Sequence, residues 1–254
     1  MIDSHCHLNF PCFAEDLAVI LSQCQANNIR RIVIPGTQAA SWPTLISLSQ
    51  SSPLLEFSLG LHPYFLEEYA EDDLALLDQL LTRHRQCVVA VGEIGLDNTL
   101  NTSFALQEHV FVQQLLLAQK HQLPVIIHHR RSHNQLIRAL KAHLPSKGGI
   151  IHGFSGSLYE AQTYLNMGFK LGVGGTITYS RASKTRKVFS QLPLSSLVLE
   201  TDAPDMPLKG KQGQRNSPVY LPLILSALQQ LRNESDEEVA QACEKNTWDI
   251  FDLN

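Results

Sequence analysis

The sequence lacks the features that mark disulfide-stapled, secreted and membrane-spanning chains. Its five cysteines are odd in number, widely spread and without a C-x-x-C pair, which favours reduced thiols over a disulfide framework. The opening MIDSHCH has no basic segment and no long apolar one, so we expect no signal peptide. No apolar run reaches the roughly 18 residues that a membrane-spanning helix needs. These absences predict a cytoplasmic protein that does not bind a membrane.

The sequence also has no excess of positive charge. Its 20 lysines and arginines and 24 aspartates and glutamates leave a formal net charge of −4, so no global positive field attracts nucleic acid. Any polyanion must therefore be bound by a local group of basic residues. We find no repeat, low-complexity segment, linker or sign of an obligate protein partner. The 254 residues predict a single domain, 1–254, with a sizeable core.

What the sequence does contain is a regular alternation of strand-like and helix-like segments. The strand-like runs are Met1–His5, Arg31–Pro35, Glu56–Leu61, Val88–Ile94, Pro124–His128, Gly148–His152, Phe169–Val173 and Leu197–Glu200. The helical patterns are Ala14–Asn27, Ser41–Gln50, Asp72–Arg85, Phe104–His121, His133–His143, Leu158–Met167, Ala182–Gln191 and Tyr220–Gln230. Eight such pairs over about 250 residues are typical of a (β/α)8 TIM barrel, whereas an open doubly wound sheet rarely repeats the unit so often.

Three helix starts have capping-box spacing, in which a serine is followed three residues later by Glu or Gln. They are Ser132 with Gln135, Ser157 with Glu160, and Ser235 with Glu238. The last of them predicts an extra C-terminal helix that runs through Phe251.

Six polar residues lie near the ends of predicted strands: His5, His7, Glu93, His128, His152 and Asp202. Strand side chains alternate faces, so His5 and His7 share one face and Cys6 points away. Barrel active sites are built at the carboxyl ends of the strands, where all six would meet. A lone histidine there is usually structural, but H-x-H with four further donors predicts a site for one or two divalent metals in a hydrolase.

Five segments carry a family resemblance: IDSHCHLNF, GEIGLD, PVIIHHRRS, HGFSGS and ETDAP. They resemble the signatures of the TatD-type metal-dependent hydrolases, or TatD DNases, which are (β/α)8 enzymes of the amidohydrolase-like group. The resemblance runs from Met1 to about Asn246. It implies that His5, His7 and Asp202 hold one metal, that His128 and His152 hold a second, and that Glu93 bridges them. It also implies phosphodiester hydrolysis, mainly of DNA.

The chain departs from the family pattern at two places beside these residues. Asn98-Thr99 follows GEIGLD, where the family usually has one or two tyrosines. After His128 the chain reads His129-Arg130-Arg131-Ser132, where the family usually has a small residue, an arginine and a later acid. Because the metal ligands are untouched, the departures bear on the substrate rather than on the reaction type.

The ligand types predict the chemistry. Two cations about 3.5–4 Å apart polarise a phosphoryl oxygen, generate hydroxide near neutral pH and stabilise the leaving oxygen. We expect Glu93 to bridge them and Asp202 to act also as the general base. Imidazole-rich ligation favours Zn, Mn, Fe or Ni over Mg. We therefore expect two divalent ions per chain, with Zn as the bound metal and Mn or Mg open for activity.

Three residues are predicted to contact substrate, namely His62 in GLHPYF, Arg130, and Asn216 in RNSP. Glu200 shares a strand face with Asp202, so it is a candidate to support the metal ligands. Basic groups at Arg130-Arg131, Arg181–Lys187 and Lys209–Arg215 would form a positive rim, although solvated helix faces are their default interpretation. The rim favours DNA or an oligonucleotide as substrate. Hydrolysis of a small-molecule amide, lactone or ester stays open, and so does a non-catalytic metal-binding protein.

Overall fold

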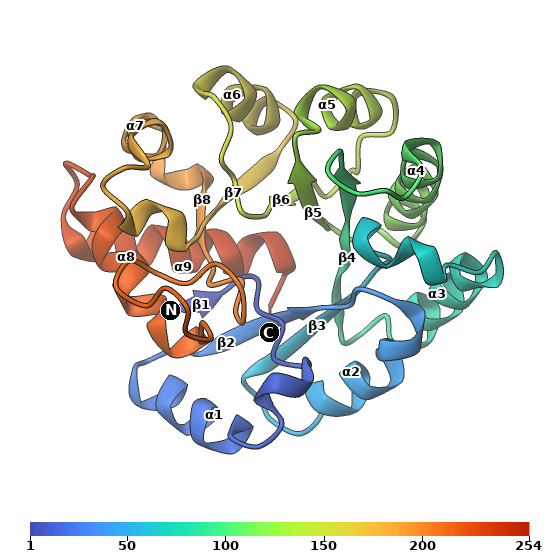
Figure 1. The fold of residues 1–254 in the computed structure, drawn as a ribbon, viewed down its shortest axis with the longest axis horizontal. Helices are drawn as coiled ribbons and strands as arrows, with labels where there is room; N and C mark the ends of the chain where they lie inside the picture. Colours follow the sequence, from blue (N-terminus) through green and yellow to red (C-terminus); the bar gives the residue numbers. More distant parts are fainter. Residues whose placement is uncertain (254) are drawn as a thin grey trace.

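The computed structural model describes residues 1–253, in which eight parallel strands pair in sequence order and are surrounded by helices (Figure 1). The strands are β1 (Ile2–Asp3), β2 (Arg31–Pro35), β3 (Leu55–Leu59), β4 (Val88–Asp97), β5 (Val125–Arg130), β6 (Gly149–Ile151), β7 (Phe169–Val173) and β8 (Leu197–Leu199). The α-helices are α1 (Leu17–Ala26), α2 (Trp42–Ser49), α3 (Asp72–Arg83), α4 (Phe104–His121), α5 (His133–Ala142), α6 (Leu158–Asn166), α7 (Ser183–Gln191), α8 (Leu221–Gln229) and α9 (Asp236–Phe251).

Short 3-10 helices lie in the loops: η1 (Pro11–Phe13), η2 (Ala39–Ser41), η3 (Pro63–Glu68), η4 (Gly175–Thr178), η5 (Leu194–Ser196) and η6 (Pro218–Tyr220). Every predicted strand and helix is present within a few residues of its expected bounds. The predicted (β/α)8 TIM barrel with an extra C-terminal helix, α9, is therefore confirmed. No helix within residues 1–253 is both long and apolar enough to cross a membrane.

The barrel closes where the chain continues beyond β1 and β8. The Ser4 N–H donates to the Leu199 carbonyl oxygen at 2.9 Å. The Asp202 N–H donates to the His5 carbonyl oxygen, also at 2.9 Å. This seam joins the two ends of the sheet and places the H-x-H segment directly beside the segment that carries Asp202.

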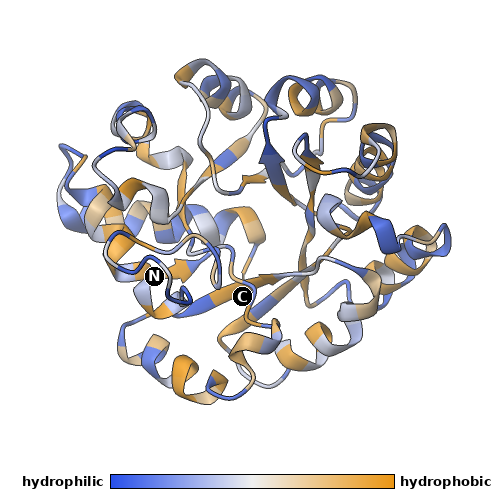
Figure 2. Ribbon diagram, viewed as in Figure 1, coloured by the Kyte–Doolittle hydropathy of each residue, from blue (hydrophilic) through white to orange (hydrophobic). Residues whose placement is uncertain are grey.

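Apolar side chains fill two layers, one inside the barrel and one between the strands and the helices. The inner layer consists of Ile2, Val33, Val89, Ala90, Ile126, Ile150 and Val198. The outer layer includes the buried rings of Trp42, Phe111 and Tyr164. In Figure 2, hydrophobic colour is frequent along the strands, while the helices carry both hydrophobic and hydrophilic residues. The interior is thus a packed core, as in other barrels of this type.

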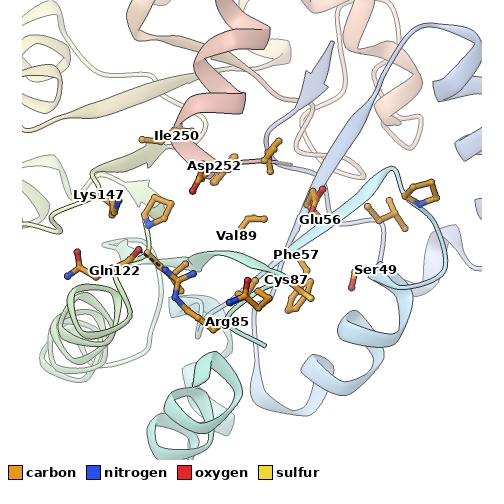
Figure 3. Close-up of a pocket in the computed structure, with 18 of the residues that line it drawn as sticks. Ser49, Glu56, Phe57, Arg85, Cys87, Val89, Gln122, Lys147, Ile250 and Asp252 are labelled. Carbon is orange, nitrogen blue, oxygen red and sulfur yellow. Dashed lines mark hydrogen bonds between the residues drawn. The ribbon is translucent and has the colours of Figure 1, made fainter. Parts of the chain in front are cut away.

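The C-terminal segment covers the end of the barrel opposite the strands' carboxyl ends. Phe251 and Leu253 pack against the inner apolar layer. A cavity of about 870 Å³ lies beside them at the starts of β3, β4 and β5, and Figure 3 shows Arg85 and Lys147 on its wall. Val89 belongs to both this wall and the inner layer, so the packed core separates the cavity from the other mouth of the barrel.

Two of the three predicted capping boxes are confirmed, at Ser157 and Ser235. The one at Ser132 is wrong. The Ser132 hydroxyl donates to the Leu96 carbonyl oxygen at 2.6 Å and makes no capping bond to α5. This contact ties the start of α5 to β4, and a contact between elements cannot be read from local spacing.

Candidate metal centre

The six predicted ligands meet at the carboxyl-end mouth of the barrel. Glu93 lies within β4 and His128 within β5, while His5, His7, His152 and Asp202 follow shortly after β1, β6 and β8. Four of the side chains are buried, and His128 and Asp202 are partly buried. The fold thus brings together residues from five strands, as predicted from their positions at strand ends.

One group of four atoms, the first donor set, comes from His5, His7, Glu93 and Asp202. The His5 Nε2 lies 3.2 Å from the His7 Nε2, 3.2 Å from the Glu93 Oε2 and 3.4 Å from the Asp202 Oδ1. The His7 Nε2 lies 3.4 and 3.6 Å from the same two oxygens. A tetrahedron with bonds of about 2.0–2.1 Å to the metal has edges of about 3.3–3.4 Å. Five of the six distances among these atoms are close to that length, and His5, His7 and Glu93 form one group that could hold a divalent ion.

The other oxygen of Glu93 faces a second donor set. The Glu93 Oε1 lies 3.4 Å from the His128 Nδ1 and 3.3 Å from the His152 Nε2. The His62 Nε2 lies 3.3 Å from the same oxygen, so the ring predicted as a substrate contact stands beside this donor set. One carboxylate turns one oxygen to each set, which is the geometry of a bridging ligand.

Two carboxylates support the imidazoles of the second donor set from behind. The His128 Nε2 lies 3.2 Å from the Asp97 Oδ2, and the His152 Nδ1 lies 3.4 Å from the Glu200 Oε1. Such carboxylates fix the ring orientation and tautomer of metal-binding histidines. Glu200 was a candidate for this role from strand parity. Asp97 was missed, although it lies four residues after Glu93 in β4 and so has the same parity.

The charges of the centre are balanced by its imidazoles. Burial lowers the pKa of His152, but the carboxylates of Asp202, Glu93 and Glu200 outweigh it and raise this pKa to about 10. Burial raises the pKa of Glu93, but the neighbouring histidines, His5 first, hold it well below its ordinary value. Burial raises the pKa of Asp202 to about 6. The carboxylates of the cluster therefore favour positive charge at its centre. Divalent cations would supply that charge, and the imidazoles would release their extra protons when they bind the metal.

A glycine allows β4 and β5 to approach closely at the site. Gly95 has a φ of 149°, and a Cβ at this position would lie 2.1 Å from the His128 carbonyl oxygen. Only glycine fits there, since both the backbone conformation and the space exclude a side chain. Gly95, the second glycine of GEIGLD, thus lets the strands that carry Glu93 and His128 lie close together.

Two glutamines on α4 hold the ends of β3 and β4. The Gln114 side chain accepts from the Leu61 N–H at 2.7 Å and donates to the Leu61 carbonyl oxygen at 3.1 Å. Gln107 binds Asp97 in the same way, at 2.9 and 3.1 Å. The two glutamines are seven residues apart and so lie on one face of the helix. They position the segments that carry His62 and Asp97, and their helical spacing is the only sequence signal for this role.

A cavity of about 470 Å³ opens over the two donor sets and is called the mouth cavity here. Glu93, His128 and Asp202 line it, and so does Arg130 at the end of β5. Figure 2 shows the end of β5 in the hydrophilic colour. Arg130 therefore lines the same cavity as the donor sets, and its contact with a substrate stays a prediction.

The side chain of Asn216, which the sequence predicted as a substrate contact, makes hydrogen bonds within the fold. It is fully buried, and its amide nitrogen lies 2.8 Å from the carbonyl oxygens of both Thr201 and Asp205. Its side-chain oxygen accepts from the Ser217 N–H at 2.9 Å. These bonds fasten the loop after β8, and they depend on a chain path that the RNSP motif does not reveal.

Part of the predicted positive rim is used inside the fold. The Arg186 guanidinium donates to the Ile177 carbonyl oxygen, and the Arg215 guanidinium pairs with the Asp16 carboxylate. The rim therefore offers a substrate fewer basic side chains than the sequence predicted. Arg130 is the member of the rim that lines the mouth cavity.

The comparisons with known proteins agree with this geometry. The chain is 45% identical over 253 residues to the uncharacterized metal-dependent hydrolase YjjV of Escherichia coli K12, covering 99% of this chain and 98% of that protein. The crystal structure of YjjV superposes with a TM-score of 0.97, covering 100% and 98% of the two chains. The 3′-5′ ssDNA/RNA exonuclease TatD of Pantoea vagans is 31% identical over 261 residues, covering both proteins completely.

The family model described as TatD related DNase matches residues 2–252, which is nearly the whole chain. The match includes both donor sets, the glycine between them and the supporting carboxylates. The chain therefore belongs to the TatD-related DNase family of metal-dependent hydrolases.

Proposed function

We propose that this protein is a divalent-metal-dependent phosphodiesterase that acts on DNA or oligonucleotides in the cytoplasm, with residues 1–254 forming one catalytic domain. The observation that carries the proposal is the position of Glu93, whose two oxygens face two separate donor sets at an open mouth. A paired, open site is typical of phosphoester hydrolysis.

Two bound ions, with Zn as the expected resident metal and Mn or Mg able to support activity, would polarise the phosphoryl oxygen and lower the pKa of an attacking water. The residues of the chain then have distinct roles. Glu93 holds the two donor sets at a fixed separation. Asp202 turns its Oδ1 toward His5 and His7, and its other oxygen accepts the proton of the attacking water.

Two observations support a nucleic-acid substrate. Arg130 lines the mouth cavity and supplies a guanidinium for a phosphate group. The relative from Pantoea vagans, which matches over its whole length, is named as an exonuclease of single-stranded DNA and RNA.

One observation favours a small neutral substrate as the alternative. Asp205 also lines the mouth cavity, and a carboxylate there repels a polyanion. A small amide, lactone or ester would avoid this repulsion. A non-catalytic metal-binding protein is the least favoured function, because it would not need a cavity of about 470 Å³ over the donor sets.

The test is a metal-dependent activity screen. Protein freed of metal is supplied with Zn, Mn or Mg and given single-stranded oligonucleotides, small phosphodiesters, amides and lactones in parallel. The Glu93→Ala variant serves as the background control. Cleavage of phosphodiesters that requires metal and Glu93 supports the proposal. Cleavage of amides or lactones alone would contradict it.

A further inference from the structure

The mouth cavity has an aromatic edge on the side of β1 and β3, made of Phe10, Tyr64 and Phe65. All three residues line the same cavity as the two donor sets. The Phe10 ring stacks on His7, with ring centroids 4.8 Å apart and an angle of 19° between the planes. The Phe65 ring packs edge-on against Tyr64, with centroids 5.0 Å apart. The edge thus continues directly from the imidazoles of the donor sets.

Tyr64 is the member of this edge that faces solvent most. It is 63% exposed, whereas Phe10 and Phe65 are only partly exposed. A large ring exposed to water contributes no hydrophobic free energy in the free protein. When a flat ligand covers the ring, the burial of its apolar surface favours binding. Among the large hydrophobic side chains of residues 1–253, only Tyr159 is more exposed, at 79%, and it does not line the mouth cavity.

The backbone holds Tyr64 in a fixed position relative to the donor sets. Its N–H donates to the His62 Nδ1 at 3.1 Å, and the other ring nitrogen of His62 faces Glu93. The His62 N–H in turn donates to the Thr37 carbonyl oxygen at 2.9 Å. The tyrosine is therefore presented by an anchored segment, and binding a ligand on its ring requires little ordering of the loop.

We propose that Tyr64 is a stacking platform for one nucleobase next to the phosphodiester at the metal centre. This inference rests on the proposed function. Exposed aromatic rings beside a phosphate-binding group are how proteins bind single strands, because every base has a face that can stack. A base inside a duplex is already stacked on both faces and paired. An unpaired base has a free face that can cover Tyr64 while Arg130 contacts the backbone.

The experiment uses the metal-loaded protein and a single-stranded DNA trimer. Three further trimers each carry an abasic tetrahydrofuran unit in place of one base, which keeps the phosphates and removes one stacking face. The variants are Tyr64→Ala, Tyr64→Phe and, as the matched control of an exposed tyrosine elsewhere, Tyr159→Ala. The readouts are kcat/KM for each trimer and metal content for each variant.

The expected result is that the wild-type protein loses about 5- to 100-fold in kcat/KM when one particular base is removed, the range of a lost base–aromatic stack. Tyr64→Ala should show the same loss on the intact trimer and no further loss on that abasic trimer. Tyr64→Phe and Tyr159→Ala should behave like the wild type, and metal content should be equal throughout.

Two outcomes would overturn the inference while leaving the proposed function intact. One is a wild-type protein that cleaves all four trimers equally well. The other is a Tyr64→Ala variant that keeps the full preference for the base. If the wild-type protein cleaves no trimer with any metal, the proposed function itself fails and the stacking platform fails with it.

Discussion

At the scale of single residues, the centre depends on Glu93. Its side chain is only 2% exposed, and histidines from four different segments lie within 3.2 to 3.4 Å of its two oxygens. Buried carboxylates are normally costly, so their charge must be compensated by neighbours or by a metal. Glu93 is therefore the carboxylate that faces both donor sets.

Replacing Glu93 with Gln should lower metal binding at both donor sets, because each loses a charged ligand atom. We expect about two divalent ions per chain in the wild-type protein and fewer than one in Glu93→Gln. Elemental analysis of protein never exposed to chelator measures this stoichiometry. Glu67→Gln, an exposed residue of η3, is the control and should keep both ions. Two ions in Glu93→Gln would remove the bridging role.

Replacing Asp202 with Asn tests the proton acceptor. The amide keeps an oxygen that can face His5 and His7, but it cannot take up a proton. We expect metal content to be largely kept and kcat to fall about 10²-fold or more. Steady-state kinetics on a phosphodiester, together with elemental analysis, separate the two effects. A variant with normal turnover would leave Asp202 only a coordinating role.

The five cysteines are free thiols in two different environments. Cys6, Cys24 and Cys243 are buried, and burial raises the pKa of the Cys24 and Cys243 thiols to about 12. Cys12 and Cys87 are exposed. Because only the thiolate is nucleophilic, a thiol reagent near pH 8 should modify two cysteines quickly in the folded protein and all five after denaturation. A third fast thiol would contradict the packing.

The residues that the sequence predicted well are those whose position follows from strand ends. The six predicted ligands are polar side chains at the carboxyl ends of apolar runs, so the fold class alone brings them together. The role of Asn216 could not be predicted, because it depends on the path of the loop after β8. The place of His62 beside the second donor set depends on its ring orientation, which strand parity does not determine.

At the scale of elements, α4 connects the outer layer of the barrel to the metal centre. Its glutamines at 107 and 114 bind backbone groups at the ends of β4 and β3, although most of its buried face is apolar. The sequence predicted the bounds of this helix as observed, but buried glutamines in a helix carry no signal of which strand they reach. The capping box at Ser132 failed for the same reason, since its partner lies on β4.

Replacing Gln114 with Leu should remove both bonds to Leu61 and leave a buried N–H and a buried C=O without partners. The expected loss is about 1–3 kcal/mol in the free energy of unfolding, measured by urea denaturation. Gln113→Leu, one residue earlier and only partly buried, should change this free energy much less. Equal stability of the two variants would show that Gln114 does not fasten the end of β3.

At the scale of the whole molecule, electrostatics separates the two candidate substrates. The protein carries a net charge of −4, and part of its basic rim is engaged within the fold. A nucleic acid must therefore be attracted locally, by the metal ions and by Arg130. A small neutral substrate would need no such attraction, so the dependence on salt distinguishes them.

For a single-stranded oligonucleotide, the logarithm of the association constant should fall linearly with the logarithm of the salt concentration. The slope should be about −0.7 for each phosphate whose counterions are released. Arg130→Ala should make the slope less steep by about 0.7, with unchanged metal content. Arg85→Ala is the matched control, because Arg85 lies on the cavity at the opposite end of the barrel (Figure 3). Arg186 is unsuitable for this test, since its loss would also release the Ile177 carbonyl oxygen. The measurement is Kd or KM over a salt series.

A flat series, with hydrolysis of small neutral substrates intact, would reject the nuclease function and favour the small-molecule alternative, because no phosphate backbone would then be bound at the mouth.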